Sequence, residues 1–223
     1  MTIPGDDIAK TEGDEKIIGL LQSKMETATM TAHDDLVAMF VGDGTGNFSK
    51  DFDGILNGAD NGTLYGTYGG IVRSENTWWK GYVDSTGGAV TLDLVNSAIG
   101  QTTIAQKKPD LAFTTQAIYD KLWARVQPQQ RFLDSKSTLA QVGFSGINFN
   151  GHMEIIVDNH VPAGYMLGMN TEYWKLVLNR KRNFFWTAEK VPVDADAYIR
   201  QMLTMGNLLC NQCRTNFILS GLT

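Results

Sequence analysis

Cysteine, histidine and proline are scarce in this chain of 223 residues, which contains two Cys, three His and five Pro. Two cysteines allow at most one disulfide bridge, so the sequence excludes a small scaffold framed by disulfides. Charged residues make up only 19% of the chain, and the formal net charge is −5. That balance argues against a protein that grips nucleic acid through a basic surface.

Long apolar runs are also absent from the sequence. The N-terminal residues 1–7 carry no apolar core of a secretory signal. No apolar run approaches the length of about 20 residues that a membrane-spanning helix needs. We therefore expect a product of a reducing cytoplasm that has no contact with a membrane.

Motifs of known active sites are incomplete or missing. Gly42–Asn47 looks superficially like a phosphate loop, but it lacks the Gly-Lys-Ser/Thr ending and follows a predicted helix. Asp51 and Asp53 lack the ligand spacing of a calcium loop. Gly143-Phe-Ser-Gly146 is not a nucleophile elbow, and a turn after a strand explains the polar residues around Asp158. We predict no catalytic residue, no metal and no cofactor.

The C-x-x-C pair Cys210 and Cys213 is the arrangement that most favours chemistry. A full zinc site needs two further ligands. The histidines are badly placed for this, because His33 lies on a predicted helix and His152 and His160 are eight residues apart across a strand. We expect two buried, reduced, metal-free thiols. A small thiol or metal enzyme built on this pair is the alternative from another functional class.

Apolar residues at every third or fourth position predict one long amphipathic helix over Asp14–Val41. Asp14 suits the N-terminal cap, and Gly42 suits a left-handed stop. The apolar stripe is narrow, which favours a helix that lies on a sheet over a helix in a bundle. We expect this packing to use the stripe residues Ile17, Leu21, Met25, Ala32 and Leu36.

The middle of the chain mixes helices with short strands. The glycine-rich stretch Gly42–Gly70 predicts turns with short strands or irregular loops. A second helix is predicted over Thr91–Lys108 and a third over Gln116–Val126, each ended by a following proline. A short strand, Asp110–Thr115, is predicted between them.

In the C-terminal part of the chain, apolar residues alternate with other residues, a pattern typical of β-strands. Val142–Val157 predicts a hairpin, and further strands are predicted within Tyr165–Leu178 after a turn at Pro162. Arg180-Lys181-Arg182 is predicted to be a polar turn before a buried strand. Asp194–Cys213 suits either a helix or strands. The fold class is therefore α+β.

The order of these pieces resembles the tailed-bacteriophage major capsid protein family, which has the Hong Kong 97 type fold. Two blocks of this sequence resemble the family most. They are the Arg-Ser-x-Asn-x-Trp-Trp block and the Asp…Pro-x-Gly-x-Met/Tyr…Asn block. Together the matching segments cover most of the chain. They are Gly69–Trp79, Lys108–Thr115, Gly143–Gly151, Val161–Asn170 and Gly206–Asn211.

The resemblance implies a division of the chain into domains. Residues 1–57 would hold the spine helix and the start of the peripheral domain, residues 58–130 the axial domain, and residues 131–223 the return to the peripheral sheet and the C-terminal segment. Structural and assembly roles would fall on Ile17, Leu21, Met25, Leu36, Trp78, Trp79, Asp158 and Pro162.

In this family an N-terminal arm and an extended loop precede the spine helix, whereas only about a dozen residues precede it here. These parts are therefore expected to be missing. With them missing, we expect a monomer or small oligomer in dilute solution. An exposed apolar patch would then lie on the outer side of the spine helix or on the glycine-rich stretch after it.

The function that the resemblance implies is structural. The chain would assemble with itself into hexamers and pentamers of an icosahedral head, in the cytoplasm of a bacterial host, and would end in the virion. The head would enclose dsDNA without sequence-specific binding, with scaffolding and portal proteins as further partners. An encapsulin-like nanocompartment shell is the alternative with the same fold. Another phage structural protein, such as a tail or decoration protein, is disfavoured. Those proteins are usually all-β, whereas this sequence predicts a long helix.

Overall fold

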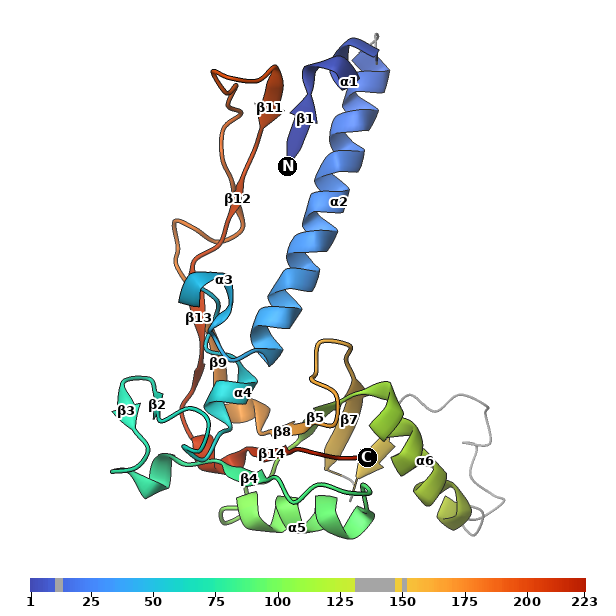
Figure 1. Cartoon of the computed structure of the whole chain (residues 1–223), viewed down its shortest axis with the longest axis vertical. Helices are drawn as coiled ribbons and strands as arrows, with labels where there is room; N and C mark the ends of the chain where they lie inside the picture. The colour runs from blue at the N-terminus through green and yellow to red at the C-terminus, as the bar shows by residue number, and fades with distance from the viewer. Residues whose placement is uncertain (11–13, 131–146, 150–151) are drawn as a thin grey trace. The chain divides into compact units, whose positions relative to one another are not determined.

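The structure is a computed structural model that describes residues 1–10, 14–130, 147–149 and 152–223 (Figure 1). The chain forms two compact units. Unit 1 consists of Met1–Ala38 and Leu176–Asn207, and unit 2 consists of Met39–Lys175 and Leu208–Thr223. Helices and strands occur throughout the described chain, so the predicted α+β class is confirmed.

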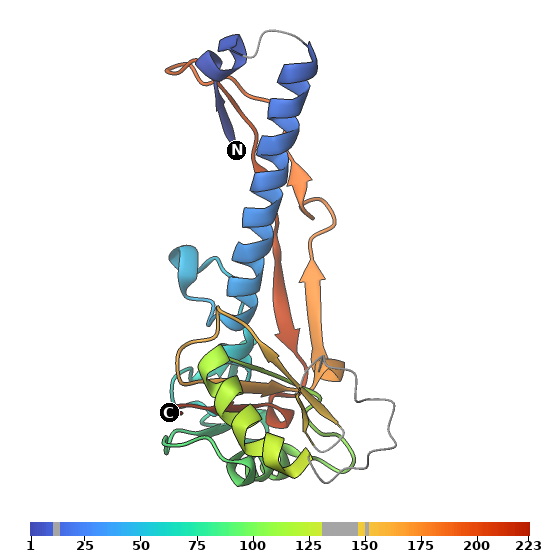
Figure 2. The ribbon, with the colours of Figure 1, turned by 90° about the vertical axis from the view of Figure 1, so that its right-hand side faces the viewer.

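Unit 1 combines most of one long helix with narrow two-stranded ribbons. β1 pairs antiparallel with β11, and β10 pairs antiparallel with β12. Figures 1 and 2 show the ribbons running alongside the helix. Among the described hydrophobic residues of this unit, only Ile3 and Ala197 are buried. The elements are β1 (Thr2–Pro4), α1 (Gly5–Lys10), α2 (Asp14–Val41), β10 (Phe185–Trp186), β11 (Ala197–Ile199) and β12 (Met202–Leu203).

The long helix α2 begins and ends at the predicted residues, Asp14 and Val41. The predicted left-handed stop at Gly42 is wrong, because the first glycine after the helix with a positive φ is Gly44, at 84°. The backbone of Gly54 packs closely against the C-terminal carbonyl groups of α2. A Cβ on Gly54 would lie 2.6 Å from the carbonyl oxygens of both Met39 and Phe40. A close tertiary contact therefore covers this helix end, and a local turn motif is not needed.

Unit 2 is built on a six-stranded mixed sheet with the order β4-β14-β8-β5-β7-β6. β14 is parallel to β4, and β5 is parallel to β7, whereas the other neighbours are antiparallel. The two strands β9 and β13 pair with each other outside this sheet, and each has residues in both units. The strands are β4 (Tyr82–Asp84), β5 (Leu111–Thr114), β6 (Ile147–Phe149), β7 (Met153–Val157), β8 (Met166–Met169), β9 (Trp174–Leu178), β13 (Gly206–Cys210) and β14 (Phe217–Leu219).

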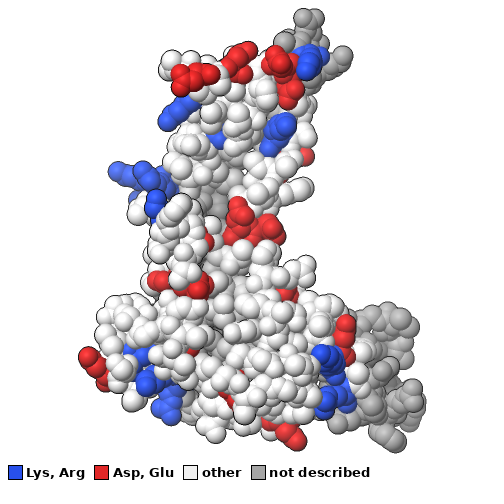
Figure 3. Space-filling model, viewed as in Figure 1, with Lys and Arg blue, Asp and Glu red and all other residues white. Residues whose placement is uncertain are grey.

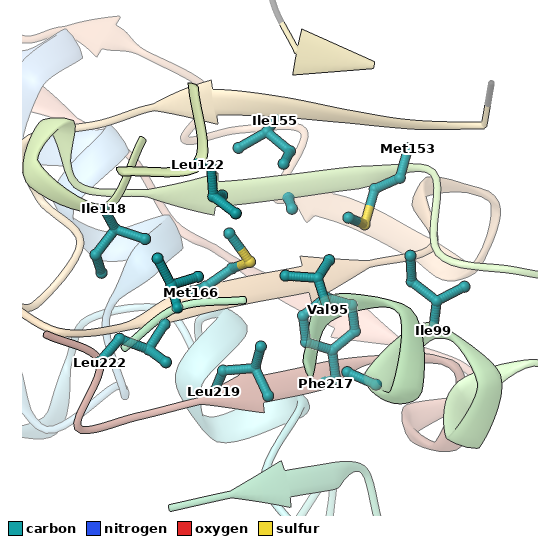
Figure 4. Close-up of a cluster of buried hydrophobic side chains, with 13 residues drawn as sticks. Val95, Ile99, Ile118, Leu122, Met153, Ile155, Met166, Phe217, Leu219 and Leu222 are labelled. Carbon is teal, nitrogen blue, oxygen red and sulfur yellow. The ribbon is translucent and has the colours of Figure 1, made fainter. Parts of the chain in front are cut away.

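Two helices cover one face of the sheet and enclose its core, α5 (Leu92–Thr102) and α6 (Gln116–Gln130). Figure 4 shows the buried side chains of these helices meeting those of the central strands. The strands β8 and β14 approach closely, because a Cβ on Gly168 would lie 2.1 Å from the ring of Phe217. The labelled core residues are Val95, Ile99, Ile118, Leu122, Met153, Ile155, Met166, Phe217, Leu219 and Leu222.

The remaining elements of unit 2 are short. They carry the glycine-rich stretch and the segment with two adjacent tryptophans. These elements are α3 (Gly46–Ser49), α4 (Ile55–Gly58), β2 (Thr67–Tyr68), β3 (Ile71–Val72), η1 (Thr77–Trp79), η2 (Thr171–Tyr173) and η3 (Cys213–Thr215).

Both predicted helix ends in unit 2 are wrong. α5 starts one residue after the predicted Thr91, whose side chain caps the helix by accepting a hydrogen bond from the Leu94 N–H, but it stops at Thr102 and not at Lys108. The chain then makes a tight turn in which Ala105 has a φ of 53°. α6 continues two residues past Pro128. A proline near a helix end removes only one backbone hydrogen bond, so it does not have to end the helix there.

The predicted strands fall where the pattern placed them. β5, β7, β8 and β9 are confirmed, as is the antiparallel pair β6–β7. Residues 142–146, 150 and 151 of the predicted hairpin lie outside the described residues. The undecided segment Asp194–Cys213 forms strands. Arg180-Lys181-Arg182 is a turn as predicted, but the strand β10 that follows is not buried, because Phe185 is 56% exposed.

The predicted domain boundaries after residues 57 and 130 do not coincide with the two units. β6 and β7 fall within the segment that the resemblance assigns to the return to the peripheral sheet, and β8 and β14 fall within the same predicted range, residues 131–223. All four hydrogen-bond into one sheet with β4 and β5, which belong to the predicted axial segment. Their apolar side chains share one core with α5 and α6. Hydrogen bonding and burial therefore join segments that the sequence alone separated.

Candidate assembly surfaces and the buried Arg73 centre

Arg73 forms the polar centre of unit 2 and is fully buried. Its Nη2 donates to the carbonyl oxygens of Asn57 at 2.6 Å and Gly58 at 3.2 Å. Its Nη1 donates to the Tyr65 carbonyl at 2.8 Å, and its Nε donates to the Trp79 carbonyl at 3.3 Å. One guanidinium thus holds together α4, the glycine-rich stretch and the tryptophan segment, using the fixed fork of donors that arginine alone provides.

The charge of Arg73 is compensated by Asp60, which is also fully buried. The nearest carboxylate oxygen, Asp60 Oδ2, lies 3.9 Å from Arg73 Nη1. That oxygen accepts hydrogen bonds from the N–H groups of Gly62 at 2.8 Å and Tyr65 at 3.0 Å. The Tyr68 ring packs against the guanidinium, with its centroid 5.4 Å from Cζ. Removing either charge would leave the other buried and unpaired, which is strongly destabilising.

The two adjacent tryptophans have different environments. Trp79 is buried, and its Nε1 donates to the Tyr68 carbonyl at 3.0 Å. Trp78 is 57% exposed, and its ring centroid lies 5.4 Å from that of Trp79. Trp79 therefore belongs to the core, whereas Trp78 lines an open hollow of about 390 Å³. The other residues of this hollow are Thr77, Lys80, Gly81, Tyr82, Gln101 and Arg214.

Asn216 is a second buried polar junction, at the start of β14. Its Oδ1 accepts hydrogen bonds from Trp174 Nε1 at 3.0 Å and from the Asn170 N–H at 3.1 Å. Its Nδ2 donates to the Cys213 carbonyl at 3.1 Å and to Cys210 Sγ at 3.3 Å. Both the donors and the acceptor of the amide are used, as a buried polar group requires.

Both cysteines are buried, as expected, and their thiols are free in the structure. The Cys213 thiol donates a hydrogen bond to the Cys210 sulfur, which lowers the pKa of Cys210 and raises the pKa of Cys213. Within the described ranges, no group of three or more His, Cys, Asp or Glu could hold a metal ion. The pair therefore has the environment of core thiols beside a polar junction.

Asp158 and Pro162 lie in two successive turns after β7. Asp158 Oδ1 accepts the His160 N–H at 2.7 Å and lies 3.0 Å from His160 Nδ1. The Tyr165 N–H donates to the Pro162 carbonyl at 3.1 Å, and Gly164 has a φ of 78° in this turn. Local turn geometry explains this polar cluster, as the sequence predicted.

The predicted stripe of α2 is half-buried where the structure describes its side chains, at Leu21, Met25 and Leu36. The side chain of Ile17 lies outside the described residues. Leu21 also lines a hollow together with Ile3 and Tyr198 of the β1–β11 ribbon. Leu21 therefore faces the ribbon across an open hollow, and the described part of the stripe is not fully buried.

A second hollow, of about 610 Å³, lies along α2 itself. Met30, at its border, is 72% exposed, and Phe48 in the glycine-rich stretch is 94% exposed. Two of the residues that line this hollow, Leu21 and Met25, belong to the predicted inward stripe, so the hollow is not on the outer side of the helix where a patch was expected. The α2 residues that line this hollow are Leu21, Gln22, Met25, Glu26, Thr29, Met30 and His33.

Large apolar side chains are exposed mainly in unit 1, although it holds the smaller part of the chain. Single exposed apolar residues are normal, whereas many on one small unit indicate an interaction surface. Those of unit 1 are Met30, Leu176, Val177, Phe184, Phe185, Val191, Val193, Tyr198 and Met205.

On the face of the described residues that Figure 3 shows, the basic residues do not form one continuous patch. Figure 3 shows Lys and Arg atoms in small groups, with Asp and Glu atoms among them and wide uncharged areas between. Among the helices of the described chain, none is long and apolar enough to cross a membrane.

Sequence reasoning missed Arg73, Asp60 and Asn216. A signal was present for Arg73, because an arginine stands between the apolar pair Ile71-Val72 and two tryptophans. No comparable signal marks Asp60 or Asn216, since exposed turns contain the same residue types.

The comparisons with known proteins agree on the fold. The family model of the SU10 major capsid protein matches residues 15–223. No curated protein matches the sequence. The structure resembles the capsid of cyanophage A-1(L), with a TM-score of 0.63 and 13% identity, over 100% of this chain and 76% of that one. It also resembles the capsid of Myoviridae phage XM1, with a TM-score of 0.59 and 9% identity, over 100% of this chain and 71% of that one.

An encapsulin shows the same fold. The holo-SrpI encapsulin complex from Synechococcus elongatus PCC 7942 contains a chain that matches with a TM-score of 0.60 and 12% identity, over 91% of this chain and 65% of that one. At such identities the likeness shows the fold alone, and the family match decides between the two kinds of shell. The chain belongs to the SU10 major capsid protein family, so it is a structural protein of the phage head and not an enzyme.

Proposed function

We propose that copies of this chain assemble into hexameric and pentameric capsomers that use the exposed apolar residues of unit 1 as their main contacts. The observation that carries this proposal is the excess of exposed large apolar side chains on a unit with little core of its own. Burying one Val or Phe side chain contributes about 1.5–3 kcal/mol. Several such side chains per interface are enough to hold closed rings together.

Phe48 and Trp78 are the proposed contact residues of unit 2. Phe48 lies on a turn in which Asn47, Phe48 and Ser49 all have positive φ angles, of 49°, 59° and 59°. This backbone is unfavourable for residues other than glycine, and it presents an aromatic ring that is almost fully exposed. Trp78 stands beside the basic side chains of Lys80 and Arg214. Aromatic and arginine side chains of this kind are enriched in interface hot spots.

The shell would enclose dsDNA without sequence-specific contacts. A net charge of −5 and scattered basic groups support containment without tight binding. Scaffolding and portal proteins are proposed as further partners, and unit 2, with its sheet and two covering helices, is proposed to contain the axial domain.

The experiment compares assembly of the wild-type chain with that of a Val177→Lys/Val193→Lys double variant. Both valines are exposed, so the monomer should keep its melting temperature. Association in sedimentation velocity over a concentration series should weaken at least about tenfold, which corresponds to a loss of about 1.4 kcal/mol. Electron microscopy of expressing cells should show fewer closed particles.

The matched control is the Gln201→Lys/Thr204→Lys variant, which adds the same two charges at exposed polar positions of unit 1. It should associate like the wild type. Equal association of the valine variant and the wild type would show that unit 1 does not carry the contacts.

A further inference from the structure

The thiols of Cys210 and Cys213 are held together by the fold. β13 ends at Cys210, and η3 begins at Cys213, so a short turn separates them. The Cys213 thiol is hydrogen-bonded to the Cys210 sulfur, and both residues are almost completely buried. Asn216 fixes both ends of this turn through Cys210 Sγ, at 3.3 Å, and the Cys213 carbonyl, at 3.1 Å.

The two sulfurs have different environments. The Cys210 sulfur accepts hydrogen bonds from the Cys213 thiol, the Gln212 N–H and Asn216 Nδ2. The positive charge of Arg73 acts on both sulfurs and does not distinguish them. Hydrogen-bond donors stabilise a thiolate, and three of them point to the Cys210 sulfur, so Cys210 is the nucleophilic partner of the pair. The pKa of Cys213 is raised by its hydrogen bond to Cys210 and by burial, so this thiol stays protonated until it reacts second.

We propose that Cys210 and Cys213 form an intrachain disulfide when the chain passes from a reducing medium into an oxidising one. The oxidant is a low-molecular-weight disulfide such as oxidised glutathione. The Cys210 thiolate attacks one sulfur of the oxidant and releases one glutathione thiolate, which leaves a mixed disulfide on Cys210. Cys213 then transfers its proton to the first released glutathione thiolate and attacks the Cys210 sulfur, releasing the second glutathione thiolate. Two thiols are oxidised, and one disulfide of the oxidant is reduced.

Burial of the pair controls when this reaction occurs. Because both sulfurs are shielded, the oxidant reaches Cys210 only through local opening of the β13–η3 turn. In a reducing cytoplasm the pair stays reduced during folding and assembly. Outside the cell, each opening event can lead to closure of the disulfide, which then restrains the turn that leads into β14.

The experiment uses the full chain, purified under reductant and transferred to oxidised glutathione without denaturant. Free thiols are then blocked by alkylation, and the intact mass is measured. The expected product has lost two hydrogen atoms, takes up no alkylating reagent and forms no covalent dimer. Its melting temperature should rise by about 5 °C and should return to the starting value on addition of reductant.

Two single variants test the assigned roles. Cys213→Ser should accumulate one glutathione on Cys210, because the second step is blocked, whereas Cys210→Ser should react far more slowly. The wild-type experiment decides the proposal even if a variant fails to fold. Retention of both free thiols, or formation of covalent dimers alone, would overturn it.

Discussion

The two units of this protein bury apolar surface to very different degrees. Unit 2 contains a six-stranded sheet, two covering helices and the buried centre of Arg73, and it holds nearly all the buried hydrophobic residues described. Unit 1 buries only Ile3 and Ala197 among its described hydrophobic residues and exposes many large apolar side chains. A narrow ribbon on a helix is marginally stable alone. We therefore infer that unit 2 is stabilised by its own contacts and unit 1 by neighbouring copies of the chain.

The largest expected effect concerns the centre of unit 2. Arg73→Met removes the donors to four carbonyl groups and leaves the Asp60 carboxylate buried without its cation. The free energy of unfolding of unit 2 should fall by about 4 kcal/mol in urea denaturation followed by circular dichroism. Arg182→Met, at an exposed turn of unit 1, is the matched control and should change it by less than about 0.5 kcal/mol. A stable Arg73→Met variant would show that the centre is dispensable.

Leucine truncation compares the units directly. Leu122→Ala, in the closed core of unit 2, should cost about 3 kcal/mol, because a cavity remains. Leu21→Ala, at the half-buried stripe of α2, should cost about 1 kcal/mol in the dilute chain, because its side chain already meets water. Thermal unfolding of both variants measures this difference. Equal losses would mean that α2 is packed as tightly as the core of unit 2.

The cysteine pair should matter little for folding under reducing conditions. A Cys210→Ala/Cys213→Ser variant should fold and keep its oligomeric state, with a loss of about 1 kcal/mol for the smaller buried side chain. Size-exclusion chromatography and thermal unfolding test this. A chelator should leave the wild type unchanged, and unfolding on its addition would point to a bound metal.

The smallest effect is a pH dependence at Tyr65. Burial and a 2.9 Å hydrogen bond from its hydroxyl to Asp43 Oδ2 raise the pKa of Tyr65 from 10.0 to about 12. The folded chain then holds this proton more tightly than the unfolded chain. The stabilisation is complete below pH 10 and is lost as the pH rises through about 12.

Tyr65→Phe isolates this contribution, because other tyrosines titrate in both proteins. Between pH 10 and 12 the stability of the variant should fall less steeply than that of the wild type. The difference should stay below about 1 kcal/mol, because Tyr65 is partly exposed. Parallel pH profiles would show that the Asp43 contact does not form in solution.

Patterns among neighbouring residues were enough to predict the long helix and several of the strands. The bounds of α2 followed from its apolar stripe, and β5, β7, β8 and β9 followed from short runs of strand-forming residues. The order of the segments also indicated the capsid family. For the candidate site, the sequence predicted that Cys210 is buried, but it did not predict the buried polar residues Arg73, Asp60 and Asn216. The assembly role expected for Trp78 and Trp79 stays a prediction.

By itself, the sequence determined the fold class, the long helix and the capsid family, because periodicity and motif order are properties of neighbouring residues. Only the tertiary structure decided which strands share a sheet, that Thr102 ends α5, and that Trp78 is exposed while Trp79 is buried. It also decided that Arg73 binds carbonyls up to 16 residues away along the chain. The physical reason is that burial and hydrogen bonding depend on which distant segments meet, and no local pattern records that.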